Sequence, residues 1–556
     1  MKLKKILGGV AGVVLIAGAV IWVNRVEIVL NAPGIVLNII DPVGPNQEVV
    51  WSQGPEIVAT PLSERPPNII FILTDDMGFN DISFYGGGAS GTTMQTPNID
   101  ALGHEGVAFS NGYAGNAVCA PSRASIMTGR YATRFGFEFT PTPPGMAALV
   151  GLVSRSSEIQ PLHPSLTFDR GESEVGSYAD LGMPRSEITI AEHLKTAGYY
   201  TAHIGKWHLG RNNGMSAIHQ GFDDSLLMAS GLYLPVDHSD VVNSRQMFDP
   251  IDRFLWPSMR YASTFNDSAP FEPRGYITDY YTDEAVKVIE ANRNRPFFLY
   301  LAHWGIHTPL QALKADYDAL SEIEDHRLRV YTAMTRAVDR SVGRVMQALK
   351  DNGLDDNTLV IFTSDNGGAG YVGLPDLNKP FRGWKLTLFE GGTHVPFFAR
   401  WPRHIPAGST FDEPVSHMDL FATASGAAGL DLPDDRIIDG VDFIPYVTGE
   451  REGAPHETLF WKDGHYRVVL NEGWKLQLSQ LPEKTWLFNL SKDPTEQINL
   501  AENLPGKVAE LTALLETHLA EQAAPLWPSE VGLSVFIDKT LADRHTEDDA
   551  YVYWEN

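Results

Sequence analysis

The chain has 556 residues, and its 69 acidic residues outnumber its 43 basic ones, which gives a formal net charge of -26 at pH 7. This charge excludes an extended nucleic-acid-binding surface, so an anionic substrate needs a local cluster of basic side chains. The hydrophobic fraction of 43% excludes a largely disordered chain, and the length predicts one large domain with a smaller one.

The N-terminal residues, 1–24, begin with three lysines and continue as an uncharged apolar run from Ile6 to Val23. This pattern predicts a signal peptide or an N-terminal membrane anchor. The run is nearly long enough to span a bilayer, while Ala17-Gly18-Ala19 fits a cleavage site. We therefore expect a periplasmic or extracellular protein, either released or anchored in the inner membrane through residues 6–23.

Residues 25–66 are apolar but interrupted by proline and glycine, so we predict a linker there. Continuous β-branched and aromatic runs then predict buried strands, at Asn68–Thr74, Gly198–Gly205, Pro296–Trp304 and Thr358–Gly367. Amphipathic helical segments alternate with these runs, notably over residues 188–198 and 329–353. This alternation predicts an α/β domain over residues 67–449, with a large, mostly parallel (mixed) sheet flanked by helices.

The pattern changes near residue 450. Short alternating runs in residues 456–490 predict a small antiparallel sheet, and residues 505–522 predict a helix. We therefore expect residues 450–556 to form a smaller C-terminal α+β domain.

Polar side chains lie at or just after the ends of all four predicted strands: Asp75 and Asp76, Lys206 and His208, His303 and His307, and Asp365 and Asn366. Ligands of open α/β sheets bind at the carboxyl ends of the strands, so we expect these residues to form one site. The carboxylate and amide oxygens suit calcium or magnesium better than zinc. A zinc site at His303 and His307 would need a helix, which Gly305 and Pro309 disfavour.

Five side chains that are cationic or can become so are candidates for binding a tetrahedral oxyanion: Arg123, Lys206, His208, His307 and Lys385. The only cysteine, Cys119, lies in the stretch CAPSRASIMTGR, where Pro121 suits the first turn of a helix. Cys119 is thus predicted at a helix N-terminus, which favours an anion such as a thiolate.

The stretch Cys119–Arg130 resembles the signature C-x-P-S-R-x-x-x-L-T-G-R of the type I, formylglycine-dependent sulfatases of the alkaline phosphatase superfamily. Met127 stands in place of leucine. The likeness runs in family order from about residue 66 to residue 501, and His394 occupies a position where family sequences often have arginine.

The resemblance implies that a formylglycine-generating enzyme oxidises Cys119 to Cα-formylglycine during export. It also implies that one calcium ion is held by residue 119 with four others: Asp75, Asp76, Asp365 and Asn366. The family's sulfate pocket corresponds to Arg123, Lys206, His208, His307 and Lys385. In the family mechanism, one hydroxyl of the hydrated aldehyde attacks sulfur and His307 protonates the leaving alcohol. His208 then takes the proton of the second hydroxyl, and sulfate leaves.

We therefore expect an arylsulfatase-like sulfuric ester hydrolase that releases inorganic sulfate from an aryl or carbohydrate sulfate ester. The same pocket would serve a phosphonate monoester or phosphodiester hydrolase. A non-catalytic protein that binds sulfated glycans is a third hypothesis, although no core position is missing. Trp304 and the insertion 141–185 are expected to shape the pocket rim, with His238 and Arg245 as further candidates.

Overall fold

The computed structural model describes residues 25–58, 60–62, 64–88, 91, 93–142, 162–168 and 177–556. The predicted leader or anchor in residues 1–24, and most of the insertion 141–185, lie outside the described residues. Within the ranges just given, no helix is long and apolar enough to cross a membrane.

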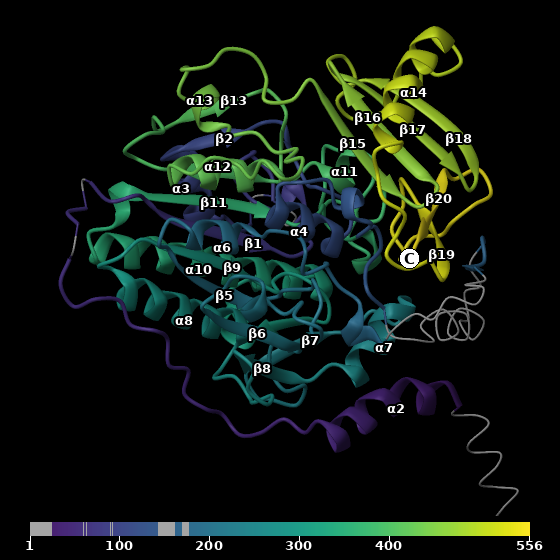
Figure 1. The fold of residues 1–556 in the computed structure, drawn as a ribbon. Helices are drawn as coiled ribbons and strands as arrows, with labels where there is room; N and C mark the ends of the chain where they lie inside the picture. Colours follow the sequence, from purple (N-terminus) through teal and green to yellow (C-terminus); the bar gives the residue numbers. More distant parts are fainter. Residues whose placement is uncertain are drawn as a thin grey trace, which may run out of the picture.

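A nine-stranded sheet forms the centre of the protein (Figure 1). Its spatial order is β13 (Ser409–Phe411), β2 (Val107–Phe109), β12 (Phe397–Arg400), β11 (Thr358–Ser364), β1 (Asn68–Thr74), β9 (Phe297–Ala302), β5 (Tyr200–Gly205), β6 (Asp224–Gly231) and β8 (Tyr261–Phe265). The central strands β11, β1, β9, β5 and β6 are parallel, whereas β12 and β8 are antiparallel to their neighbours in this group. The predicted α/β fold with a mixed, mostly parallel sheet is confirmed.

Both faces of the sheet are covered, because alternate residues of β1 enter two different cores. Ile70 and Ile72 pack in the core that contains α3 (Pro97–His104), α8 (Ile277–Asn292) and α10 (His326–Asp351). Ile69 and Phe71 pack in the core that contains α4 (Cys119–Thr128), α6 (Ile190–Lys195) and α12 (Asp419–Ala427). Burial on both sides explains why β1 is a continuous apolar run.

Local signals in the sequence explain where several helices begin. The Thr189 side chain accepts a hydrogen bond from the backbone of Glu192, whose carboxylate accepts one from the backbone of Thr189, so a capping box starts α6. The Asp325 side chain caps α10 in the same position. Helix α4 begins at Cys119 and ends at Thr128, and Gly129 caps it with a left-handed φ of 67°.

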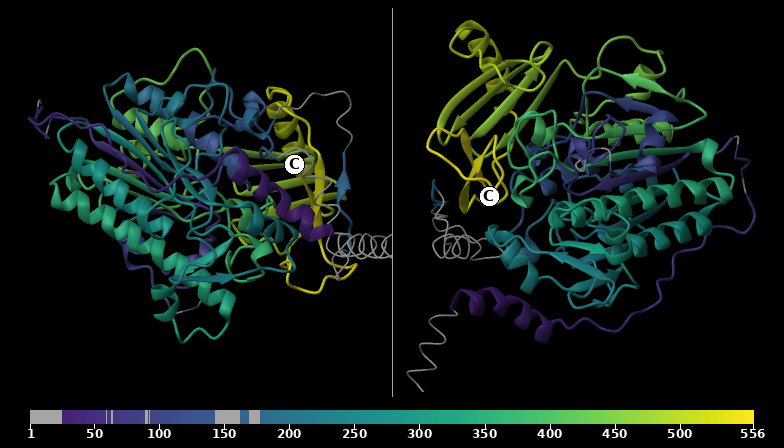
Figure 2. Two further views of the ribbon diagram at one scale, coloured as in Figure 1. Left: turned by 90° about the horizontal axis from the view of Figure 1, so that it is seen from below. Right: turned by 180° about the vertical axis from the view of Figure 1, so that it is seen from behind.

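The C-terminal part carries two smaller antiparallel sheets beside the central one (Figure 2). The first contains β15 (Thr458–Asp463), β16 (Tyr466–Asn471), β17 (Trp474–Gln480) and β18 (Glu483–Asn489), and α14 (Pro505–Leu519) packs on it. The second joins β19 (Val531–Phe536) to β20 (Tyr551–Glu555) and to β4 (Leu166–Thr167) of the insertion. The predicted antiparallel sheet and helix are confirmed, and the domain boundary near residue 450 stays a prediction.

The remaining elements are short, apart from α2. They are β3 (Gly112–Tyr113) with β14 (Val415–Ser416), β7 (Val241–Ser244) with β10 (Leu310–Leu313), α7 (Pro250–Ser258), α9 (Lys314–Asp318), α11 (Glu390–Thr393) and α13 (Ile444–Val447). The segment predicted as a linker forms helix α2 (Arg25–Ile40) over part of its length, although Pro33 lies inside it. Gly34 allows the close approach of α2 to α7, since a Cβ there would lie 2.0 Å from the Pro257 carbonyl oxygen.

Candidate active site

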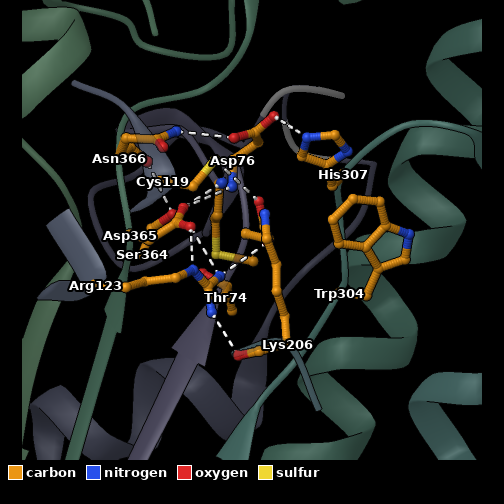
Figure 3. Close-up of polar contacts among 12 residues, drawn as sticks. Thr74, Asp76, Cys119, Arg123, Lys206, Trp304, His307, Ser364, Asp365 and Asn366 are labelled. Atoms are coloured by element: carbon orange, nitrogen blue, oxygen red, sulfur yellow. Dashed lines mark hydrogen bonds and ion pairs between the residues drawn. The ribbon is translucent and has the colours of Figure 1, made fainter. Parts of the chain in front are cut away.

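The carboxyl ends of β1, β5, β9 and β11 bring together residues as far apart as Asp76 and Asn366, which are 290 positions apart, as the fold predicts (Figure 3). We call the central group the buried cage: Asp75, Asp76, Cys119, Arg123, Lys206, Asp365, Asn366 and Lys385. Each of these residues is at most 5% exposed. His303 is not part of it, because its Nε2 lies 2.8 Å from the Ser341 hydroxyl in the core.

Arg123 connects the two sides of the cage. Its Nη2 lies 2.8 Å from Asp75 Oδ2 and 2.8 Å from Asp365 Oδ2, and its Nη1 donates to the Lys206 carbonyl. Burial alone lowers the pKa of Arg123, but the carboxylates of Asp365 and Asp75 outweigh it and raise the pKa above its ordinary value. Arg123 is therefore a permanent cation that fixes both carboxylates.

Asp76 accepts hydrogen bonds from three different side chains. Its Oδ1 accepts hydrogen bonds from Lys385 Nζ at 2.7 Å and Asn366 Nδ2 at 2.9 Å, and its Oδ2 accepts one from the Tyr371 hydroxyl at 2.6 Å. Burial favours the protonated form, but Lys385 and His307 outweigh it and hold the pKa of Asp76 well below its ordinary range. Its backbone has a left-handed φ of 61°, an unfavourable conformation that is typical of functional sites.

Cys119 is the first residue of α4, as predicted, and is 3% exposed. Its Sγ lies 3.1 Å from Lys385 Nζ and 3.8 Å from Asp75 Oδ1. Burial raises the pKa of the thiol to about 12, more than Lys206 and Lys385 lower it. The expected thiolate is therefore not favoured, because desolvation outweighs the helix N-terminus and the two lysines.

Three cage residues and the neighbouring His307 have the arrangement of a metal site. Asp75, Asp76, Cys119 and His307 each offer a ligand atom, and these atoms all lie within 4.8 Å of one another. Next to them, Asn366 Oδ1 is buried without a hydrogen-bond partner, although its Nδ2 donates to Asp76. A buried carbonyl oxygen beside carboxylates is a suitable ligand for a hard cation. This group contains His307, which was not among the predicted metal ligands. Asp365 was predicted but is not in the group, and both of its oxygens accept hydrogen bonds from protein.

The charges of the cage are balanced. Three carboxylates face three basic side chains: Asp75, Asp76 and Asp365 against Arg123, Lys206 and Lys385. A divalent cation or an oxyanion that entered alone would leave a net charge in a buried space, which is costly. The balance therefore favours the entry of a cation and an anion together.

Two histidines lie next to the cage. Burial lowers the pKa of His307 to about 3 and that of His208 well below its ordinary value, so both rings are neutral. His307 Nδ1 lies 2.6 Å from the Thr308 carbonyl, which leaves Nε2 facing Asp76 at 3.6 Å. His208 has a left-handed φ of 63°, and its Nδ1 is buried without a partner.

Trp304 does not form an exposed rim, contrary to expectation. It is 4% exposed, its ring stacks on His307 with centroids 4.0 Å apart, and its Nε1 donates to the Gly231 carbonyl. Lys206 Nζ also lies 4.7 Å from the centroid of the indole, so the buried ring has no free face for a sugar or aryl ring. His238 and Arg245 are exposed, and Arg245 lies over the Trp256 ring.

Sequence reasoning missed Tyr371. Its hydroxyl donates to Asp76 and lies 3.1 Å from Lys385 Nζ, so it contacts two cage residues. Tyr371 lies in a short 3-10 helix six residues after Asp365, and no periodicity marks it. Its position in the loop that continues from the SDNGG motif is the only signal that could have found it.

The fold and the cage define an α/β protein whose buried basic side chains suit an oxyanion. The chain belongs to the sulfatase family, because the sulfatase family model matches residues 67–430. This confirms the family resemblance.

Relatives of known name agree with this family. The chain is 35% identical over 385 residues to human N-acetylgalactosamine-6-sulfatase, covering 68% of this chain and 66% of that protein. It is 31% identical to human steryl-sulfatase, covering 77% of each. The crystal structure of Ps i-CgsB has a TM-score of 0.68 at 29% identity, covering 83% of this chain and 95% of that one. The same protein has been solved in complex with k-i-k-neocarrahexaose.

Proposed function

We propose that this protein hydrolyses sulfate esters with a formylglycine made from Cys119 and one bound calcium ion. The observation that carries the proposal is the placement of Cys119 at the start of α4, in the cage, with Lys385 Nζ 3.1 Å from its sulfur. A thiol whose pKa is raised to about 12 stays protonated and is a poor nucleophile. Residue 119 can therefore supply a nucleophile only after its oxidation to the aldehyde. Once hydrated, the aldehyde supplies one hydroxyl for attack and a second for release of sulfate.

The calcium site is proposed at Asp75, Asp76, Asp365 and Asn366 together with residue 119. The unpaired Asn366 Oδ1 and the carboxylates support this set, because all their donors are hard oxygens. Bound calcium would polarise the oxyanion and lower the pKa of a nearby hydroxyl. His307 is an additional candidate ligand, since its Nε2 lies 3.6 Å from Asp76.

The chain's own side chains would bind and orient the ester. Lys206 and Lys385 offer ammonium groups to the equatorial sulfate oxygens, and Arg123 fixes the carboxylates behind them. We assign protonation of the leaving oxygen to His307. Its ring is neutral when the pocket holds no anion, and a bound sulfate ester favours the protonated form. His208, with its unpaired buried Nδ1, is the proposed acceptor of the second proton.

Sulfated carbohydrate is the substrate class that the relatives favour. One relative is an N-acetylgalactosamine-6-sulfatase, and a similar structure was solved in complex with k-i-k-neocarrahexaose. The relative's name describes that protein alone, so we propose aryl sulfate esters as substrates as well as carbohydrate sulfate esters. We also infer export, with maturation by a formylglycine-generating enzyme, from the lysines and the apolar run in residues 1–24.

The test is a mass measurement of the peptide containing Cys119, made together with an assay on 4-nitrophenyl sulfate with and without chelator. We expect the mass of a formylglycine and hydrolysis that chelation abolishes and calcium restores. Rates measured in parallel on 4-nitrophenyl phenylphosphonate and on 4-nitrophenyl sulfate distinguish a phosphonate hydrolase from a sulfatase. An unmodified cysteine in protein made with a competent maturation enzyme, with no hydrolysis, would contradict the proposal and favour a glycan-binding protein.

A further inference from the structure

Helix α2 carries large aliphatic side chains on a surface that faces away from the rest of the protein. We call this surface the α2 apolar face: Ile28, Val29, Ile35, Val36, Ile39 and Ile40. These six residues are between 43% and 74% exposed. At about 100° per residue, they cover an arc of roughly 140° of the helix.

The opposite side of α2 is fixed against α7. Leu30 is 1% exposed, and Gly34 lies so close to the Pro257 carbonyl that no side chain fits between them. After the last residue of the helix, Asp41 Oδ2 pairs with Arg260 Nη2 at 3.0 Å. The helix lies at the lower edge of the molecule in the right view of Figure 2, and in the left view, from below, it lies in front of the other elements. Its orientation is therefore set by packing, and the apolar face points outward.

This arrangement reverses the usual pattern of a surface helix, in which the outward arc is polar. No charged residue occurs between Glu27 and Asp41. Asn38 lies outside the apolar arc, so α2 still has a polar flank. Contiguous exposed apolar surface on a soluble protein marks a site of interaction.

The neighbouring sequence identifies the occupant of this surface. The apolar run Ile6–Val23 ends two residues before α2 begins at Arg25, and its sequence predicts membrane insertion. When that run is in a bilayer, the connection through Asn24 holds the start of α2 at the membrane surface.

We propose that α2 lies on a phospholipid bilayer, with the α2 apolar face inserted among the lipid chains. The net charge of -26 opposes attraction to anionic lipids, so burial of aliphatic side chains must supply the binding. The interaction should therefore occur on zwitterionic vesicles and should change little with salt. This proposal does not depend on the hydrolase activity.

The test uses a fluorescent label on the full chain, in which Cys119 is the only native cysteine. Cys119→Ala is combined with Ile39→Cys in one variant and with Asn38→Cys in a matched control, and each is labelled with NBD. Both proteins are incorporated into phosphatidylcholine vesicles with and without doxyl-labelled lipid. We expect the probe at position 39 to be quenched by doxyl lipid and protected from iodide, while the probe at position 38 is quenched by iodide.

Every other outcome overturns the proposal. Iodide quenching at position 39 would show that the face is in water. Quenching by neither agent would show that protein covers the face, either a second copy or the chain's own N-terminal segment. Near-ultraviolet circular dichroism of both variants checks that the buried Cys119→Ala substitution and the exposed substitutions at positions 38 and 39 leave the fold intact.

Discussion

Two buried clusters of charged side chains differ in whether all their polar atoms are paired. The junction cluster (Glu390, Lys475, Glu496) lies where α11 meets β17. Lys475 Nζ lies 2.7 Å from Glu390 Oε1 and 3.2 Å from Glu496 Oε1. His394 Nδ1 lies 2.9 Å from the other Glu390 oxygen, and the Glu390 backbone donates to Glu496 Oε2. Every charged atom of this cluster has a protein partner.

In the buried cage, by contrast, the Asn366 Oδ1 has no partner, and the His208 Nδ1 beside the cage has none either. An unpaired buried polar atom costs about 1–3 kcal/mol, and the Asn366 Oδ1, which lies beside carboxylates, is available to a bound cation. The junction cluster is complete and stabilises the contact between the main sheet and the C-terminal sheet. The difference between the clusters thus separates a structural role from a functional one.

The largest expected effect is that of Cys119→Ala on hydrolysis. Without the thiol no aldehyde forms, and we expect sulfatase activity to fall by about four orders of magnitude or more. The free energy of unfolding should change by only about 1 kcal/mol, because a small side chain is removed. Initial rates on 4-nitrophenyl sulfate and urea unfolding measure the two quantities. Residual activity near the wild-type rate would contradict the assigned role.

Lys475→Met should have the opposite effect and mainly reduce stability. Glu390 and Glu496 would be left buried without their cation, so the free energy of unfolding should fall by about 3–5 kcal/mol. Urea unfolding measures this loss, and kcat per folded molecule should stay near the wild-type value. Adding Glu496→Gln should recover part of the stability. A loss below about 1 kcal/mol would mean that the junction cluster does not stabilise the contact between the main sheet and the C-terminal sheet.

Tyr371→Phe sharpens the comparison, because it removes one hydroxyl from the edge of the cage. Loss of the hydrogen bond to Asp76 should lower calcium affinity or kcat by about 10- to 100-fold, with little change in unfolding. Calorimetric calcium titration gives a readout that does not depend on activity. Tyr85→Phe is a matched control, since the Tyr85 hydroxyl is buried without a partner. Equal effects of the two substitutions would contradict a positioning role for Tyr371.

The smallest expected effect is a pH dependence from the junction cluster. Burial raises the pKa of Glu496 from 4.5 to about 7; Lys475 opposes the shift and Glu390 adds to it. The stability contributed by protonated Glu496 is complete below pH 4.5 and is lost as the pH rises through 7. Between these values, wild-type stability should fall relative to Glu496→Gln by on the order of 1 kcal/mol. Parallel stability curves for the two proteins would contradict the assignment.

Much of the fold could be predicted because its signals are local. The runs at residues 68–74 and 358–364 are mostly apolar, since both faces of those strands are buried. Pro121 and the motif around it place Cys119 at the start of a helix. The order of strands and helices then predicts that polar strand ends share one edge of the sheet, so the proposed site residues were named from sequence.

Side-chain contacts between distant positions were decided only by tertiary packing. The sequence does not indicate that Tyr371 reaches Asp76, that Trp304 is buried behind His307, or that Lys475 is shared by two glutamates 106 residues apart. It also gives no sign that α2 turns its aliphatic side chains outward, because helical periodicity identifies a face but not what lies against it. Periodicity and capping depend on neighbours along the chain, whereas burial, pKa and exposure depend on which atoms packing brings within a few ångströms.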